Sequence, residues 1–317
     1  MRVTNTETMP ARRGSGAAPP VVLCAGMAVL DFMFRVDRFP SPSTKAMARE
    51  FFLTGGGNAA NAAIAITRLG GRARFCGPVG DDEFGQRVLD GLVKEGVDIG
   101  GAQRVEGAAT SVSGIFVDPA GERLLTTRRA QGLEKAPPPK NCARLVEGAG
   151  AVLADNHFPD FAAPICRAAR ERNIPVVLDV DKPATEPADP LLALASHAIF
   201  SAEALRAAAA IGDLAAALER ASAFCRGFVA ATDGAAGALW HDGHALRRQE
   251  AFAVNAVDTL AAGDVFHAAF TLALAEGRAE AKALRFASAA AALKCARFGG
   301  IAGAPTRAEV EHLLMKS

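Results

Sequence analysis

A loop of small side chains at Ala261-Ala262-Gly263 leads directly into a stretch of helical character, Val265–Ala275. The first turn of a helix carries backbone N–H groups without intrahelical partners and a partial positive charge. Because these side chains are so small, an anion can approach the N–H groups closely. The loop therefore predicts a binding site for a phosphoryl group.

Asp264 follows this loop at the start of the predicted helix. A carboxylate beside a phosphate is repulsive, so it adds nothing to simple anion binding. It is useful where a hydroxyl attacks phosphorus, because a carboxylate can accept the hydroxyl proton. The alternative is that Asp264 only caps the helix. The residues alone leave both interpretations open.

A second polar segment places Asn58 and Asn61 just after Gly55-Gly56-Gly57, at the start of a predicted helix over 58–69. Residues three apart share one helix face, and each amide can donate to and accept from a sugar hydroxyl. The glycines let a ligand approach the backbone. Helix capping by the asparagines is the alternative interpretation.

The same segment satisfies a dinucleotide-binding pattern, Gly55-x-Gly57-x-x-Ala60, with Asp81 further along the chain. This pattern should directly follow the first strand of the fold. The first strand predicted here ends before Gly26, so the placement is wrong. An NAD-dependent oxidoreductase is therefore a remote alternative.

The composition excludes some classes of partner. The chain has 317 residues, with 35 basic and 34 acidic side chains, whereas nucleic-acid binding requires an excess of Lys and Arg. No run of about 20 apolar residues is present that could span a membrane. The six cysteines have no metal-ligand spacing, which indicates free thiols in a reducing compartment. We expect a cytoplasmic protein that binds small molecules.

Short apolar runs alternate with helical stretches along most of the chain, beginning with a strand at 21–25. This alternation predicts an α/β fold with a doubly wound, mainly parallel sheet flanked by helices. Two β-rich excursions, at about 38–54 and 110–127, predict a small sheet that covers the site as a lid. Residues 1–20 are rich in Arg, Gly, Ala and Pro, and we expect a disordered tail there. The fold then occupies residues 21–317 as one domain.

Three segments together resemble the signatures of the PfkB (ribokinase-like) carbohydrate kinase family: Gly56–Asn61, Gly77–Gly85 and Asp258–Phe266. The resemblance runs from about Val21 to Pro305, nearly the whole chain. It implies an ATP-dependent sugar kinase with a central sheet, flanking helices and a β lid. It also implies that Mg²⁺ accompanies ATP.

The resemblance assigns roles to individual residues. Asp264 would deprotonate the acceptor hydroxyl. The transferred phosphoryl group would be held by Ala261, Ala262 and Gly263. Sugar hydroxyls would be bound by Asp31, Gly57, Asn58 and Asn61. The nucleotide phosphates would contact the turn that contains Thr232, Gly234 and Gly237.

The family's metal-binding motif matches this sequence less well than its other motifs do. The family's Asn-x-x-Glu motif is replaced here by Ser201-Ala202-Glu203, with the acid displaced by one position. We expect Asp179 and Glu203 to hold Mg²⁺ through water, with Asp181 as a further candidate. By analogy with the family, a monovalent cation, K⁺, would be held near Asp258 and Leu260.

The acceptor is predicted from Val29-Leu30-Asp31, Gly56–Asn61 and Leu293-Lys294-Cys295. Together they resemble ketohexokinases and the related sulfo-sugar kinases more than ribokinase, so we expect a ketose phosphorylated at a primary hydroxyl. Ribose, a 2-keto-3-deoxy sugar acid and a nucleoside are alternative acceptors, and a non-catalytic sensor is a further kind of function. The family also implies a homodimer formed through the lid, since exposed strand edges favour pairing.

Overall fold

The main sheet of the protein contains six parallel strands, as seen in a computed structural model that describes residues 18–182, 189–225, 227–242 and 244–316. These strands are β1 (Val21–Ala25), β4 (Arg72–Cys76), β9 (Ala151–Asp155), β10 (Val176–Val180), β11 (His197–Ser201) and β12 (Phe228–Thr232). Two antiparallel strands, β13 (Ala238–His241) and β14 (Leu246–Gln249), complete one edge. The tail predicted for residues 1–20 lies outside the described residues, apart from its last three.

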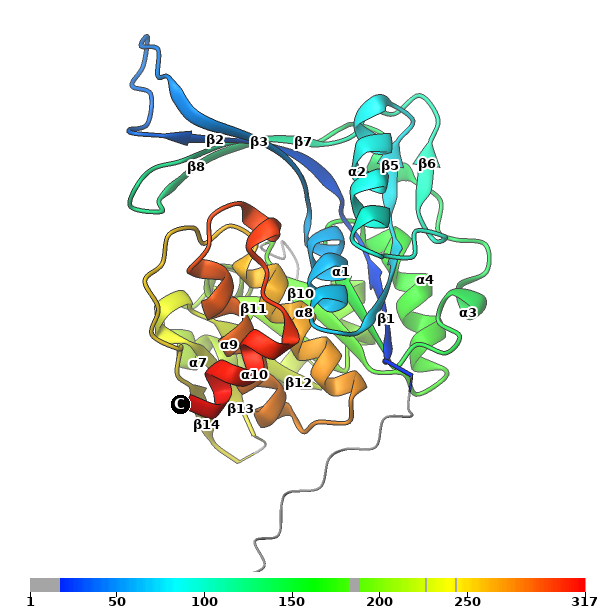
Figure 1. The fold of residues 1–317 in the computed structure, drawn as a ribbon. Helices are drawn as coiled ribbons and strands as arrows, with labels where there is room; N and C mark the ends of the chain where they lie inside the picture. The colour runs from blue at the N-terminus through cyan, green and yellow to red at the C-terminus, as the bar shows by residue number, and fades with distance from the viewer. Residues whose placement is uncertain (1–17, 183–188, 226, 243, 317) are drawn as a thin grey trace, which may run out of the picture.

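The strand order is β14-β13-β12-β11-β10-β9-β1-β4 (Figure 1). Every residue of β1, β9 and β10 is buried, as expected of strands that are covered by helices on both faces. Alternate side chains of each strand enter different cores: Val22 and Cys24 lie in one, Leu23 and Ala25 in the other. The predicted doubly wound sheet is confirmed.

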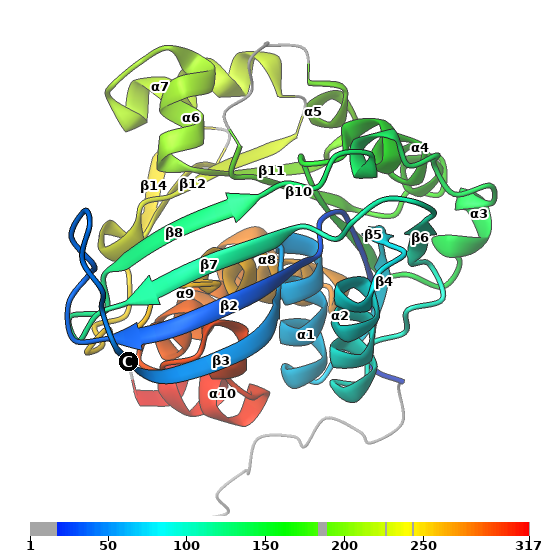
Figure 2. The same cartoon turned by 90° about the horizontal axis from the view of Figure 1, so that it is seen from above.

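Two layers of helices cover the sheet (Figure 2). One layer contains α1 (Asn58–Arg68), α2 (Glu83–Lys94), α8 (Ala262–Ala275), α9 (Glu280–Cys295) and α10 (Arg307–Lys316). The other contains α3 (Cys142–Leu145), α4 (Pro159–Arg170), α5 (Pro190–Leu194), α6 (Ala202–Ala209) and α7 (Leu214–Phe224). Short 3₁₀ turns lie at η1 (Leu133–Lys135), η2 (Gly234–Ala236) and η3 (Gly300–Gly303).

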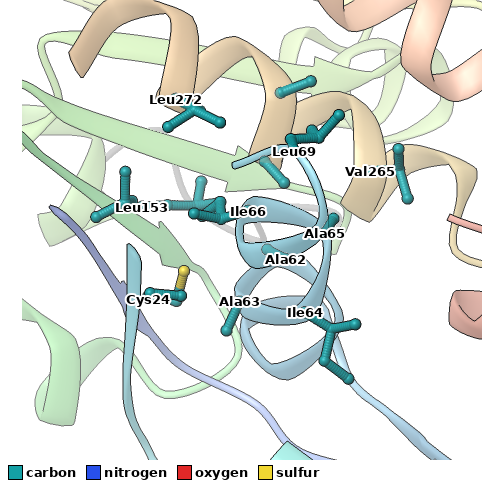
Figure 3. Close-up of a cluster of buried hydrophobic side chains, with 14 of the residues drawn as sticks. Cys24, Ala62, Ala63, Ile64, Ala65, Ile66, Leu69, Leu153, Val265 and Leu272 are labelled. Carbon is teal, nitrogen blue, oxygen red and sulfur yellow. The ribbon is translucent and has the colours of Figure 1, made fainter. Parts of the chain in front are cut away.

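Alanine-rich packing holds α1 against α8. All residues of α8 from Val265 to Ala273 are buried, because this helix contacts α1, α9 and the sheet. Figure 3 shows Ile66 of α1, Leu153 of β9 and Leu272 of α8 in the same buried cluster. Small side chains allow the helix backbones to approach closely. The first turns of α1 and α8 are therefore held at a fixed separation.

A second, four-stranded sheet projects from the main body (Figure 1). It contains β2 (Val29–Val36), β3 (Ala48–Gly56), β7 (Val112–Val117) and β8 (Arg123–Arg128), in the order β3-β2-β7-β8. The separate small sheet that the sequence predicts is present, although its first strand lies at 29–36, before the predicted range of 38–54. Its action as a lid stays a prediction, and the name lid is used below for this sheet. The strand β2 also belongs to the lid, because only three residues separate it from β1 and the sequence pattern does not mark the change of sheet.

A third, small sheet pairs β5 (Pro78–Gly80) with β6 (Gln103–Val105) in parallel. It lies beside α2 at the end of the molecule near β4 (Figure 2). Within the described part of the chain, none of the helices has the length and apolar character that a membrane span requires.

Candidate active site

A cavity of about 400 Å³ lies where the carboxyl ends of the central parallel strands meet the first turns of α1 and α8, beneath the lid. This edge is where ligands bind in open α/β sheets. Among the residues predicted from the sequence, the cavity is lined by Asp31, Gly57, Asn58, Asn61, Asp179, Thr232, Leu260, Ala261, Ala262, Gly263 and Asp264. Glu203, Gly234, Gly237 and Asp258 are not part of its lining.

The small-residue loop forms the start of α8. Ala261 has φ 62° and ψ 9°, a left-handed conformation, and directly precedes the helix. The N–H of Ala262 donates to Thr259 O and that of Val265 to Ala261 O. Within the described residues, the N–H groups of Gly263 and Asp264 have no acceptor. The predicted anion site thus has two backbone donors at a helix N-terminus, at the wall of the cavity.

Asp264 lies inside the first turn of α8, and its side chain is not the helix cap. Its Oδ2 accepts a hydrogen bond of 2.6 Å from Asn61 Nδ2. Burial, followed by the charge of Asp179, raises the pKa of Asp264 to about 7, while the Asn61 bond lowers it. A carboxylate with a pKa near neutrality is a stronger base than an ordinary aspartate. The capping interpretation is therefore wrong, and the geometry suits a base.

Asn58 bridges two carboxylates at the end of β10. Its Nδ2 donates to Asp179 Oδ2 at 2.9 Å and to Asp181 Oδ2 at 3.0 Å. Burial and the nearby charge of Asp181 raise the pKa of Asp179. The second carboxylate oxygen of Asp179 is buried without a hydrogen-bond donor. The Nδ2 group of Asn58 is therefore engaged with two carboxylates, and its predicted contact with sugar stays a prediction.

These two carboxylates fit an indirectly held Mg²⁺. This ion keeps several waters and is bound through one or two carboxylates together with substrate phosphates. Asp179 and Asp181 both line the cavity. Asp179 Oδ1 accepts no hydrogen bond, although His267 Nε2 lies 3.4 Å from it, so it can accept from a metal-bound water. Within the described residues, no cluster of three or more His, Cys, Asp or Glu side chains could bind a metal directly.

Glu203 does not share this position. It is exposed in the first turn of α6, whereas Ser201 caps that helix by accepting from Ala204 N and lines the cavity. The displacement by one residue relative to the family motif therefore turns the acid away from the site. The expectation that Glu203 holds Mg²⁺ is not supported.

Asp31 enters the cavity from the lid strand β2. Burial raises the pKa of Asp31 to about 6, and a hydrogen bond from Ser113 opposes this shift. Gly56 lies directly beside it, where an added Cβ would collide with the Asp31 carboxylate. Across the cavity, Asn61 Oδ1 is buried without a partner. Asp31 and Asn61 thus present polar oxygens that sugar hydroxyls can satisfy.

Sequence reasoning missed the role of Asp155. This buried carboxylate at the end of β9 accepts hydrogen bonds from the N–H groups of Met27 at 2.6 Å, Ala59 at 3.2 Å and His157 at 3.1 Å. It therefore joins the turn after β1 to the first turn of α1. An aspartate that ends an apolar strand was the available signal.

His157 extends this network to the cavity. Its Nε2 lies 3.1 Å from Asp181 Oδ1. Burial opposes protonation, yet the hydrogen bond to Asp181 and the charge of Asp155 raise the pKa of His157 overall. A positive imidazolium here would offset part of the negative charge at the end of β10.

The predicted nucleotide turn follows β12. Thr232 lines the cavity, and its hydroxyl donates to Phe200 O at 3.4 Å. An added Cβ on Gly237, which has φ 83°, would collide with Gln249 O, so this glycine is needed for the pairing of neighbouring strands. Gly234 has open space around it. The contact of this turn with nucleotide remains a prediction.

One carbonyl oxygen at the expected site for a monovalent cation is engaged by a side chain of the protein. The carbonyl oxygen of Asp258 accepts a hydrogen bond of 2.8 Å from Lys294 Nζ. In the sequence, Lys294 stands out only as part of a segment that resembles ketohexokinases. Nothing there indicates this contact, which joins residues 36 positions apart.

Residues 20–307 match the pfkB family of carbohydrate kinases. The chain belongs to this family. An ATP-dependent ribose-1-phosphate kinase from Halopiger xanaduensis is 34% identical over 295 residues, which cover 92% of this chain and 97% of that protein. Bacillus subtilis ribokinase is 30% identical over 292 residues, covering 91% and 97%. Solanum tuberosum fructokinase is 29% identical over 327 residues, covering 95% and 98%.

Solved structures agree with this assignment. A proposed ribokinase from Agrobacterium tumefaciens superposes with a TM-score of 0.90 at 38% identity, covering 94% of this chain and 98% of that one. A ribokinase from Arabidopsis thaliana, complexed with ribose and ATP, gives 0.80 at 26% identity, covering 95% and 100%. This pfkB-family protein is thus a carbohydrate kinase with a ribokinase-like fold, and the oxidoreductase alternative is wrong. The relatives differ in their acceptors, so they leave the sugar open.

We expect Gly263→Ala to retain the fold but to lower turnover by about tenfold or more, because a methyl group would obstruct the N–H groups of the anion site. Gly263 lines the cavity, and an added Cβ would meet no atom within 4 Å. Turnover and melting temperature measure the two effects. Gly91→Ala in α2 is the control, since its Cβ also meets no atom within 4 Å and it lies outside the cavity. Wild-type turnover in Gly263→Ala would contradict the assigned anion site.

The activity of this kinase should rise with pH around neutrality. Because the pKa of Asp264 is raised to about 7, its carboxylate form increases through that pH, and kcat/KM should level off above about pH 8. Asn61→Ala removes the hydrogen bond that lowers this pKa, so its profile should shift to higher pH. A pH-independent kcat/KM from about pH 6 to 8 would show that Asp264 is not the titrating base.

Proposed function

We propose that this kinase transfers the γ-phosphoryl group of ATP to a primary hydroxyl of a small ketose, with Asp264 as the base. The proposal depends on one observation: a carboxyl with a pKa of about 7 adjoins two backbone N–H groups without acceptors. A base of this kind can accept a hydroxyl proton at neutral pH. The donors can stabilise charge on the group that is transferred.

In the proposed reaction, the sugar hydroxyl gives its proton to the Asp264 carboxylate as its oxygen bonds to the γ-phosphorus. The bond between that phosphorus and the β–γ bridging oxygen breaks, and ADP leaves with the electron pair. The Gly263 and Asp264 N–H groups donate to the transferred group during this step. Asn61 keeps the base in place through its 2.6 Å hydrogen bond.

The remaining polar groups of the cavity bind the two substrates. Mg²⁺ held through water at Asp179 and Asp181 would offset the charge of the ATP phosphates. The turn after Thr232 would contact the nucleotide. Asp31 and the free Oδ1 of Asn61 would bind sugar hydroxyls, because both lie at the cavity wall and are buried.

The ketose assignment is supported by the local similarity of Leu293-Lys294-Cys295 to ketohexokinases and by the fructokinase relative. Ribose is the second candidate, because a ribokinase at 30% identity covers 91% of the chain. A panel containing fructose, ribose and their acid and phosphorylated derivatives, assayed by ADP release with ATP and Mg²⁺, separates these acceptors. Release with ribose and not with fructose would overturn the ketose assignment and leave the kinase assignment intact.

We expect Asp264→Asn to lower turnover by about 10²–10⁴-fold, since the amide cannot accept the hydroxyl proton. Its size is almost unchanged and its oxygen can still accept from Asn61, so sugar and ATP should bind with similar affinity. Steady-state kinetics together with isothermal titration calorimetry measure both properties. Wild-type turnover in this variant would mean that another group is the base.

We also propose a homodimer formed through the lid. On β3 and β8, Phe51 is 54% and Leu124 is 47% exposed. Phe34 packs against both Phe51 and Phe116, and Leu124 is the register partner of Phe116, so these side chains form one apolar face. Asp31 and Ser113 lie at alternate positions and face the cavity. Apolar patches of this kind mark interfaces, and a second copy can supply the matching surface.

Sedimentation velocity should therefore show a dimer at micromolar concentration. Leu124→Asp should shift the protein towards monomer, because a carboxylate would be desolvated in the contact. Val93→Asp is a matched control on α2, where Val93 is 54% exposed. A wild-type protein that sediments only as a monomer would contradict the proposed contact.

We place the enzyme in the cytoplasm. All six cysteines are free thiols, four of them buried, and disulfide-free proteins are typical of reducing compartments. The proposed co-substrate ATP is consistent with that location.

A further inference from the structure

Lys294 is a fully buried cation behind the catalytic loop. It belongs to the last turn of α9, and its side chain is 0% exposed. Its Nζ lies 2.9 Å from Asp258 Oδ2 and donates to the carbonyl oxygens of Asp258 at 2.8 Å and Arg297 at 3.4 Å. Burial lowers the pKa of Lys294, and the Asp258 carboxylate opposes that shift. A buried ammonium is tolerated only with such partners.

Asp258 connects this cation to two loops. Its Oδ1 accepts from the N–H of Leu260 at 2.9 Å, and its Oδ2 accepts from those of Gly299 at 3.0 Å and Gly300 at 2.8 Å. Leu260 directly precedes Ala261 in the anion-binding loop. The Lys294–Asp258 pair therefore holds the segment before α8 against the turn that follows α9.

The residues here do not fit a bound monovalent cation. Such an ion would need the carboxylate of Asp258 and nearby carbonyl oxygens, because hard cations bind oxygen ligands. The carboxylate and carbonyl oxygens of Asp258 and the carbonyl oxygen of Arg297 already face the ammonium of Lys294. A second positive charge at the same place would be repelled strongly in this buried region. The expectation of K⁺ near Asp258 and Leu260 therefore conflicts with the structure.

We propose that Lys294 replaces the monovalent cation with a charge that belongs to the chain, and that it acts as a positioning residue for the loop before Asp264. The ammonium of Lys294 then takes the place of the bound ion, so the stability and the turnover of the enzyme do not depend on K⁺. The activity part of the test rests on the proposed function, whereas the stability part does not.

The first experiment compares the wild-type protein in KCl, NaCl and tetramethylammonium chloride at equal ionic strength. Melting temperature and turnover should be the same in the three salts. A rise in melting temperature or turnover specific to K⁺ would overturn the proposal, because it would reveal a cation site that Lys294 does not fill.

The second experiment removes the ammonium. Lys294→Ala should melt at a lower temperature in tetramethylammonium chloride and recover on the order of 3 °C in K⁺ or NH₄⁺, because a cation binds only the folded state. Turnover should fall about tenfold or more and recover with the same ions. Lys294→Met fills the space with an apolar chain, so it should be impaired without recovery. Lys282→Ala, on the exposed face of α9, should match the wild type in every salt.

The results separate the possible failures. Lys294→Ala that shows no ion-specific recovery, or that equals the wild type without K⁺, would overturn the proposal. If neither Lys294 variant folds, the wild-type comparison decides alone. If no sugar is phosphorylated by the wild type, the kinase proposal fails while the melting data still report on Lys294.

Discussion

Four aspartates line one cavity, and the repulsion among three of them, Asp179, Asp181 and Asp264, is the constraint on which the site depends. Burial raises the pKa of Asp31, Asp179 and Asp264, and the charges of neighbouring aspartates raise the pKa of Asp179 and Asp264 further. A carboxyl whose folded pKa lies above its unfolded value contributes stability at low pH that is lost as the pH rises through the folded value. These carboxyls therefore contribute least to the stability of the fold at neutral pH and above, where they ionise.

The chain restrains these carboxylates with neutral donors at the front and a cation behind. Asn58 and Asn61 donate to carboxylates that line the cavity, and these hydrogen bonds oppose the rise in the pKa of Asp179 and Asp264 without adding a positive charge. Behind the loop, Lys294 neutralises Asp258 completely out of contact with solvent.

The sequence predicts those parts of the site whose functional residues lie close together along the chain. The loop at Ala261–Asp264 and the run at Gly57–Asn61 could be found because small residues, donors and acids follow one another along the chain. The Asn61–Asp264 hydrogen bond joins residues 203 positions apart, and nothing in either segment indicates its partner. A long separation in sequence also concealed the contact of Asp155 with Ala59, which are 96 positions apart.

The larger errors of prediction concern segments in which the chain passes from one environment to another within a few residues. The strand β2 is an apolar run that follows β1 after three residues, and only its pairing with β3 and β7 shows that it belongs to the lid. Glu203 was misplaced for a similar reason. A shift of one residue at a helix start rotates a side chain by about 100°, enough to turn it from the cavity to solvent.

The attachment of the lid explains how Asp31, which is proposed to bind the sugar, can be aligned with Asp264, the proposed base on the core. β1 continues into β2 through a short turn at Met27, and β3 continues into α1 through Gly57, whose φ is 91° and whose added Cβ would collide with Met27 O. Asp155 accepts from the N–H of Met27 and of Ala59, so one buried carboxylate holds both connections. The position of Asp31 relative to Asp264 is therefore determined by the core, at the point where the lid leaves it.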